Sequence, residues 1–181
     1  MTGPIVLTIL RMLLSVVFMV FALIPDAWAK IVALIIFIIA SITDKIDGIW
    51  ARKKKLVTDL GAFLDPLADK MLTGLAFLIL TYQNIIPIWV LAVILVRDYA
   101  VDGMRMMSAR TGKTIPASFL GKLKTTFQMI ALIIILLNQI VNQGPLLILG
   151  NIALYISLAL CIYSGAEYLI KGKKLIIKPK R

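Results

Sequence analysis

The sequence has no histidine, a single cysteine and few charged residues. Without histidine, proton transfer near neutral pH falls to carboxylates. The lone Cys161, in an apolar stretch, excludes a disulfide framework within the chain and a site built from several thiolates. Charged residues make up 16% and hydrophobic residues 61% of the 181 positions, against about 25% and about 45–50% in soluble domains. This composition excludes an ordinary soluble domain and indicates a surface that faces lipid.

Apolar residues gather in six segments, each near the ~20 residues that a membrane-spanning helix needs. These segments cover residues 5–24, 28–46, 60–80, 85–104, 118–140 and 146–169. Their runs are apolar without interruption and lack the period-two alternation of a membrane β-barrel. The sequence therefore predicts an all-α integral membrane protein with six transmembrane helices, forming one domain over residues 1–170 with a basic tail at residues 171–181.

The basic residues are placed unevenly between these segments. The chain has 20 Lys and Arg against 9 Asp and Glu, a net charge of +11. Residues 81–87 and 138–145 contain no Lys or Arg, whereas 18 of the 20 fall within residues 45–70, 97–124 and 171–181. Because basic loops stay on the cytoplasmic side, both termini are predicted to be cytoplasmic. Positive charge at the ends of apolar runs indicates anionic lipids and anionic substrates as partners, and no nucleic acid.

A cleaved signal peptide is an alternative for the first segment. Residues 27–29, Ala-Trp-Ala, resemble a cleavage site. However, no positive region precedes the apolar run, and Arg11 interrupts it. We therefore expect the first segment to remain attached as a membrane helix.

Acidic residues are concentrated between the second and third segments. Five of the nine lie within 26 positions, and four of these form two helical stripes. On a helix, Asp44 and Asp47 share one face with Gly48 and Ala51, and Arg52 lies one residue further round. A second stripe holds Gly61, Asp65 and Asp69. The short connection at residues 53–58 makes the two helices antiparallel neighbours, so the four carboxylates can face one another.

Four ionised carboxylates so close together need to be neutralised. One like-charge pair at 4 Å costs about 4 kcal/mol at an effective dielectric constant near 20. Protonation is one answer, and a hard divalent cation such as Mg²⁺, Mn²⁺ or Ca²⁺ is the other, because the ligand set is all oxygen. Mg²⁺ commonly takes its remaining ligands from substrate phosphates. The small residues on the stripes either leave room for such a ligand or only pack the helices together.

This spacing of aspartates and small residues, Asp44-x-x-Asp47-Gly48-x-x-Ala51-Arg52, then eight residues, then Gly61-x-x-x-Asp65-x-x-x-Asp69, resembles the signature of the CDP-alcohol phosphatidyltransferase family. The resemblance implies a six-helix membrane enzyme, active as a homodimer, that transfers a phosphatidyl group from a CDP-linked lipid to an alcohol and releases CMP. It also implies one or two Mg²⁺ or Mn²⁺ ions at Asp44, Asp47, Asp65 and Asp69, with Asp69 as general base. The CDP-lipid would contact Asp44, Asp47, Gly48, Ala51, Arg52 and Gly61.

The flanking residues narrow the acceptor alcohol. Segments around Arg11, Arg97 and Lys122 resemble the branch of the family that uses sn-glycerol 3-phosphate, which makes CDP-diacylglycerol the donor. Cations so near an apolar phase need an anionic partner or must snorkel to the surface. We expect the acceptor phosphate to bind Arg105, Lys122 and Lys124, supported by Arg97 and Arg11, with Asp98 and Asp102 pairing with some of the nearby cations.

Three alternatives remain open at the level of sequence. The acceptor could be an inositol phosphate, serine or phosphatidylglycerol within the same family. From another class, the aspartates could form the ion site of a cation- or proton-coupled carrier. Such sites usually lie near the middle of the bilayer between repeats, whereas these aspartates are predicted at the cytoplasmic ends of their helices and no repeat is present. The third alternative is a non-catalytic assembly protein with a structural metal.

Overall fold

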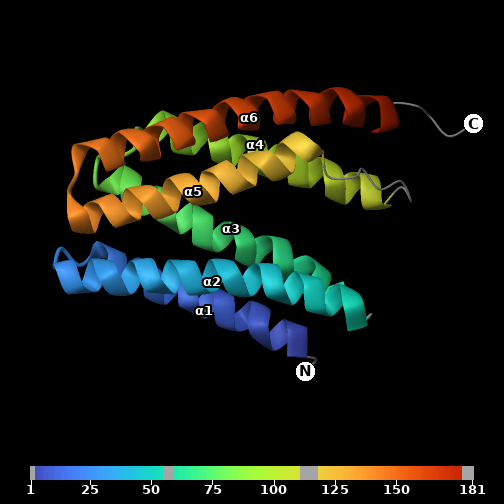
Figure 1. Ribbon diagram of the computed structural model, residues 1–181. Coiled ribbons are helices and arrows are strands. Elements are labelled where there is room, and N and C mark those ends of the chain that lie inside the picture. Colours follow the sequence, from blue (N-terminus) through green and yellow to red (C-terminus); the bar gives the residue numbers. More distant parts are fainter. Residues whose placement is uncertain (1–2, 55–58, 111–117, 177–181) are drawn as a thin grey trace, which may run out of the picture.

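Six α-helices make up the part of the chain that the structure, a computed structural model, describes (Figure 1). The described backbone covers residues 3–54, 59–110 and 118–176, and side chains are described for residues 6–43, 64, 67–68, 70–107 and 118–170. No strand occurs in these ranges. The helices are α1 (Gly3–Leu23), α2 (Ala27–Lys54), α3 (Asp59–Tyr82), α4 (Ile88–Arg110), α5 (Phe119–Val141) and α6 (Gly144–Ile176).

The helices pack as two groups of three. In the first group, α1 packs along both α2 and α3. In the second, α6 packs along α5 and α4, and the α5–α6 contact is the most extensive between any two of the described helices. The groups meet mainly where α2 contacts α5, with smaller contacts of α3 with α4 and α5. Figure 1 shows α1 and α2 on one side of the molecule, α4 to α6 on the other, and α3 between them.

The helix axes lie roughly parallel or antiparallel to one another, so the molecule has two distinct ends. At one end, here named the motif end, α2 and α4 terminate and α3 and α5 begin. At the opposite, short-turn end, three tight connections join the helices at residues 24–26, 83–87 and 142–143. Asn84 and Asn142 adopt positive φ there, at 58° and 52°. Asn tolerates this conformation better than most residues, which allows the chain to reverse.

Large apolar side chains fill the space between helices and also cover their outer faces. Phe18, Phe37 and Phe77 are fully or almost fully buried, with the Phe18 and Phe37 ring centroids 5.5 Å apart. By contrast, Val96 and Ile148 are 70% and 62% exposed, and many other Leu, Ile and Val side chains also point outward. An exposed apolar surface of this extent is unsuited to water and suits the hydrocarbon of a bilayer.

Three of the described helices are long and apolar enough to cross a membrane, judged by length and composition. They contain the stretches Val6–Leu23, Phe119–Val141 and Gly144–Ile170. Shorter apolar helical stretches lie at Ala27–Thr43 and Lys70–Tyr82. The predicted helical class and the six helices are thus confirmed for the described residues, whereas six membrane spans, cytoplasmic termini and the domain limit at residue 170 stay predictions.

At the motif end, several helices extend beyond the ends of the apolar segments that were predicted from the sequence. The predicted second, fourth and sixth segments ended at residues 46, 104 and 169, but α2, α4 and α6 continue to Lys54, Arg110 and Ile176. Lysine and arginine are good helix formers, so a helix can continue past the end of its apolar run. At about 1.5 Å per residue, α6 is about 50 Å long, which exceeds the ~30 Å hydrocarbon core of a bilayer.

Candidate functional site

The predicted metal residues lie on two helices that converge at the motif end. Asp44 and Asp47 belong to the last part of α2, and Asp65 and Asp69 to the first half of α3. The two helices run in opposite directions, as the short connection predicted (Figure 1). The side chains of these aspartates, and those of Gly48, Ala51, Arg52 and Gly61, fall outside the described residues, so their contacts stay predictions. The described side chains include no group of three or more Asp, Glu or Cys residues placed so that they could hold a metal ion.

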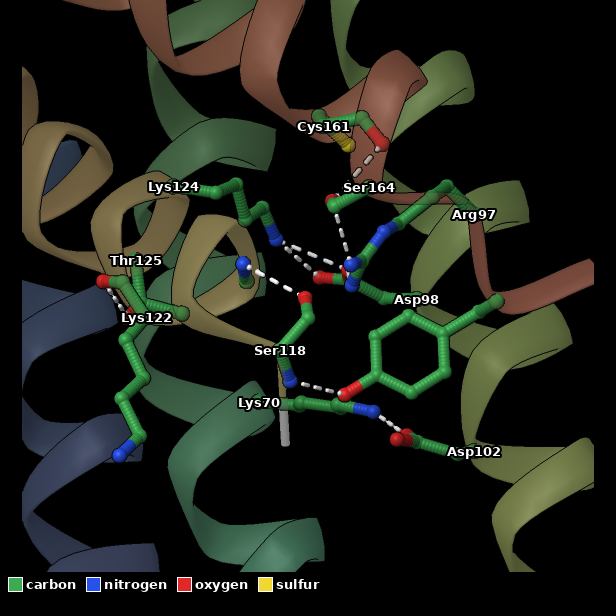
Figure 2. A network of polar contacts seen from close by, with 12 residues as sticks. Lys70, Arg97, Asp98, Asp102, Ser118, Lys122, Lys124, Thr125, Cys161 and Ser164 are labelled. Atoms are coloured by element: carbon green, nitrogen blue, oxygen red, sulfur yellow. Dashed lines mark hydrogen bonds and ion pairs between the residues drawn. The ribbon is translucent and has the colours of Figure 1, made fainter. Parts of the chain in front are cut away.

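A second set of charged residues forms a buried cluster between α4, α5 and α6 (Figure 2). The ammonium of Lys124 donates to both carboxylate oxygens of Asp98, at 2.8 Å each. Arg97 Nη1 donates to Asp98 Oδ1 at 2.9 Å, and Arg97 Nη2 donates to Ser164 Oγ at 2.7 Å. The Lys124 side chain is 3% exposed, and those of Arg97 and Asp98 are 14% and 16% exposed. Two cations and one carboxylate give this cluster a net charge of +1.

A small and an aromatic residue of α6 hold the side chain of Arg97 in place. Its stem lies against Gly165, where an added Cβ would come within 2.9 Å of Arg97 Cγ. Its guanidinium lies over the ring of Tyr168, with Cζ 5.9 Å from the ring centroid. This distance is within the range of cation–π attraction. Because a larger residue at position 165 would occupy the space of the arginine stem, α6 fixes the position of the charge on α4.

The start of α5 is fixed to the same part of α6. Ser118 caps this helix, with its Oγ accepting from the backbone N–H of Gly121 at 3.0 Å. The backbone N–H of Ser118 in turn donates to the hydroxyl of Tyr168 at 2.8 Å. A serine cap satisfies an amide that would otherwise lack a partner at a helix start. Tyr168 therefore contacts both Arg97 and the helix that carries Lys124.

The predicted acceptor residues separate into three groups in the structure. Arg97 and Lys124 come together, and Asp98 pairs with both, as expected from the sequence. Arg105 and Lys122 are exposed near the motif end, and Figure 2 shows the Lys122 ammonium directed away from that of Lys124. Arg11 is 3% exposed on α1, the helix that packs against α2 and α3. It therefore lies with the helices that carry the aspartates.

Other residues of this region were not predicted as functional. Ser118, Ser164, Gly165 and Tyr168 surround the cluster but carry no charge that would have marked them. Only Ser118 had a sequence signal, since a serine at the start of an apolar segment is typical of a helix cap. Asp102 pairs with Lys70 of α3, which was not among the nearby cations that we expected as its partners (Figure 2). This pairing depends on how α3 and α4 pack, which the local sequence does not specify.

Comparison with known proteins identifies relatives along almost the whole chain. Residues 1–163 match the CDP-alcohol phosphatidyltransferase family. A CDP-diacylglycerol–glycerol-3-phosphate 3-phosphatidyltransferase of Bacillus subtilis is 38% identical over 178 residues, covering 92% of each chain. A protein of the same name from Pectobacterium atrosepticum is 34% identical and covers 97% of each chain. A probable phosphatidylglycerophosphate synthase of Mycobacterium tuberculosis is 36% identical over 92% of this chain and 79% of its own.

Proposed function

The chain belongs to the CDP-alcohol phosphatidyltransferase family, and we propose that it transfers a phosphatidyl group from CDP-diacylglycerol to sn-glycerol 3-phosphate, giving phosphatidylglycerophosphate and CMP. The names of the relatives from B. subtilis and P. atrosepticum state this donor and this acceptor. The structural observation that carries the proposal is the buried Arg97–Asp98–Lys124 cluster beside the helices of the aspartate motif. Membership in an enzyme family argues against the ion-carrier and assembly-protein alternatives.

The donor half of the site is assigned to α2 and α3. Four aspartates supply a ligand set of carboxylate oxygens alone, which fits one or two Mg²⁺ or Mn²⁺ ions. We assign these ions to Asp44, Asp47, Asp65 and Asp69. When bound, such an ion would neutralise the pyrophosphate of the donor and the charge on departing CMP. The CDP portion is assigned to Gly48, Ala51, Arg52 and Gly61 together with the first two aspartates.

Asp69 is assigned as the general base. In the proposed step, a glycerol hydroxyl oxygen bonds to the phosphorus that carries the diacylglycerol, and its proton passes to the Asp69 carboxylate. The bond from this phosphorus to the bridging oxygen breaks, and CMP leaves with that oxygen and its electron pair. Because a carboxylate is a weak base for an unactivated alcohol, the hydroxyl must be held within hydrogen-bond reach of it. This requirement makes the position of the acceptor phosphate important.

The acceptor half is assigned to α4 and α5. Arg97 and Lys124 are held beside each other by Asp98, so a phosphate dianion would meet cations that are already oriented. Charged groups buried in a membrane protein need partners, and the net charge of +1 leaves the cluster suited to an anion. Arg105 and Lys122 are exposed at the same end and would attract the anion from solvent. Arg11 would support the site from α1.

The remaining proposals concern the membrane and the assembly. We propose that the site faces the cytoplasm at the cell or inner membrane, because basic residues are in excess at the motif end and basic segments stay on the cytoplasmic side. The basic residues 171–181 would contact anionic lipid headgroups at that face. We propose that two copies associate through their membrane helices, as the family resemblance implies.

The acceptor assignment can be tested with purified protein in detergent micelles. CDP-diacylglycerol is incubated with glycerol 3-phosphate, inositol 1-phosphate, serine or phosphatidylglycerol in separate reactions, and CMP is measured. We expect CMP only with glycerol 3-phosphate. CMP with another acceptor would retain the family and reject the proposed substrate. No CMP with any acceptor, from protein shown to be folded, would reject the transferase assignment for this chain.

A further inference from the structure

The proposed active site is divided between the two three-helix groups. Its donor half lies on α2 and α3, and its acceptor half on α4 and α5, while the contact of α3 with α4 is small. Among the described side chains, an ion pair crosses this contact at the motif end, between Lys70 of α3 and Asp102 of α4 (Figure 2). Lys70 directly follows Asp69, and Asp102 lies one helical turn after Asp98. The two paired residues are therefore sequence neighbours of the two halves of the site.

We propose that the Lys70–Asp102 ion pair is a positioning contact that sets the distance between the donor and acceptor halves. This inference rests on the proposed function. Neither residue contacts substrate in this account. Instead, the pair holds α3 against α4, so that the hydroxyl of an acceptor bound near Arg97 and Lys124 reaches Asp69. A displacement of about 1 Å between reacting groups can lower a rate about a hundredfold, so a small change at this contact is sufficient to matter.

The arrangement of carboxylates on α4 supports this role. Asp98 and Asp102 are four residues apart and so share a face of the helix. Each carboxylate forms an ion pair with a lysine of a different helix: Asp98 with Lys124 of α5, and Asp102 with Lys70 of α3. The side chains of Lys70 and Asp102 are 28% and 32% exposed, so most of each is shielded from solvent. Through these two carboxylates, α4 joins the acceptor cluster to the helix that carries Asp69.

A polar contact at the opposite end of the molecule provides a matched control. Gln139 Nε2 donates to Gln83 Oε1 at 2.7 Å, and Gln83 Nε2 donates to the backbone oxygen of Ala22 at 3.0 Å. This contact therefore links α5 to the first group at the short-turn end, far from the motif aspartates. Its loss should weaken the association of the groups without moving the two halves of the site.

The test compares Asp102→Asn, Lys70→Met and the exchanged pair Lys70→Asp with Asp102→Lys, using Gln139→Met as control. kcat and the KM for each substrate are measured by CMP release, and thermal unfolding is followed in the same detergent. We expect each single charge removal to lower kcat about tenfold or more, with each KM within about twofold. The exchanged pair should recover a large part of the lost kcat. Gln139→Met should lower the unfolding temperature and leave kcat unchanged.

The outcomes separate this inference from the proposed function. If Asp102→Asn and Gln139→Met lower kcat in proportion to their loss of stability, the pair is only structural and the inference is overturned. It is also overturned if the exchanged pair folds but recovers no activity, or if a single KM changes instead of kcat. If wild-type protein uses a different acceptor, the proposed substrate fails and the same comparison is made with that acceptor. No CMP release by folded wild-type protein would overturn both.

Discussion

Lys124 of α5 donates to both carboxylate oxygens of Asp98 of α4 at 2.8 Å, inside a helical bundle with an apolar outer surface. Arg97 donates to the same carboxylate from the other side. The carboxylate thus keeps two cations close together, where they would otherwise repel each other. A binding site whose charges are oriented before the ligand arrives loses less free energy on binding.

Replacing Asp98 with Asn should weaken both folding and acceptor binding. Removing one partner of a buried ion pair costs about 3–5 kcal/mol, because the other charge stays buried without its partner. We expect a lower unfolding temperature and a KM for glycerol 3-phosphate raised about tenfold or more, with little change in CMP binding. Asp26→Asn is the matched control, since Asp26 is exposed at the short-turn end. An equal effect of both variants would contradict the role of the cluster.

Gly165→Ala should weaken acceptor binding by displacing the side chain of Arg97. The added methyl group would come within 2.9 Å of Arg97 Cγ, so the arginine must move away from Ser164 and Tyr168. We expect a several-fold rise in the KM for glycerol 3-phosphate, measured at saturating CDP-diacylglycerol. Gly74→Ala on α3 is the matched control, because no atom other than those of its chain neighbours and its own helix backbone lies within 4 Å of the position that its methyl group would take. An alanine there should leave KM unchanged and stabilise the helix by up to about 1 kcal/mol.

Tyr168→Phe separates the contact of this tyrosine with Arg97 from its contact with Ser118. The variant keeps a ring under the guanidinium of Arg97 but removes the oxygen that accepts from the Ser118 N–H. The loss of this hydrogen bond should cost about 1 kcal/mol of folding free energy. Tyr168→Leu removes the ring as well, so we expect it alone to raise the KM for glycerol 3-phosphate further. Equal effects of Tyr168→Phe and Tyr168→Leu on that KM would contradict the role of the aromatic ring in positioning Arg97.

Removal of divalent cations should abolish CMP release and weaken CMP binding. The four motif aspartates would then repel one another without a counter-ion. We expect a chelator to remove both the activity and the thermal stabilisation by CMP, and Mg²⁺ or Mn²⁺ to restore both. Activity that persists fully in the chelator, in protein with no residual metal by elemental analysis, would contradict the metal assignment.

The helices could be predicted from the sequence because each one contains a long apolar run. Their extension at the motif end could not, since the boundary of an apolar run does not determine where hydrogen bonding of the backbone stops. Lys54 and Arg110 end helices that continue past their apolar runs. The aspartate motif was visible because its members lie close together in the sequence.

The acceptor cluster could be predicted only in part. Arg97 and Lys124 were recognised by their charge, but Lys122, two residues away from Lys124, is exposed. Which lysine of α5 is buried depends on the rotation of that helix against α4 and α6. Similarly, Asp102 pairs with Lys70, thirty-two positions earlier in the sequence, because α3 and α4 pack against each other. Uncharged contacts such as Gly165 and Tyr168 become visible only in the folded protein.

The central claim is tested most directly by identifying the product of the purified protein. Isotope-labelled glycerol 3-phosphate and CDP-diacylglycerol are supplied, and lipid and nucleotide products are quantified by mass spectrometry for the wild type and Asp69→Asn. The account predicts labelled phosphatidylglycerophosphate and CMP in equal amounts from the wild type. It predicts almost none from Asp69→Asn, although that variant still binds CMP. Unlabelled lipid product, or full activity of Asp69→Asn, would contradict it.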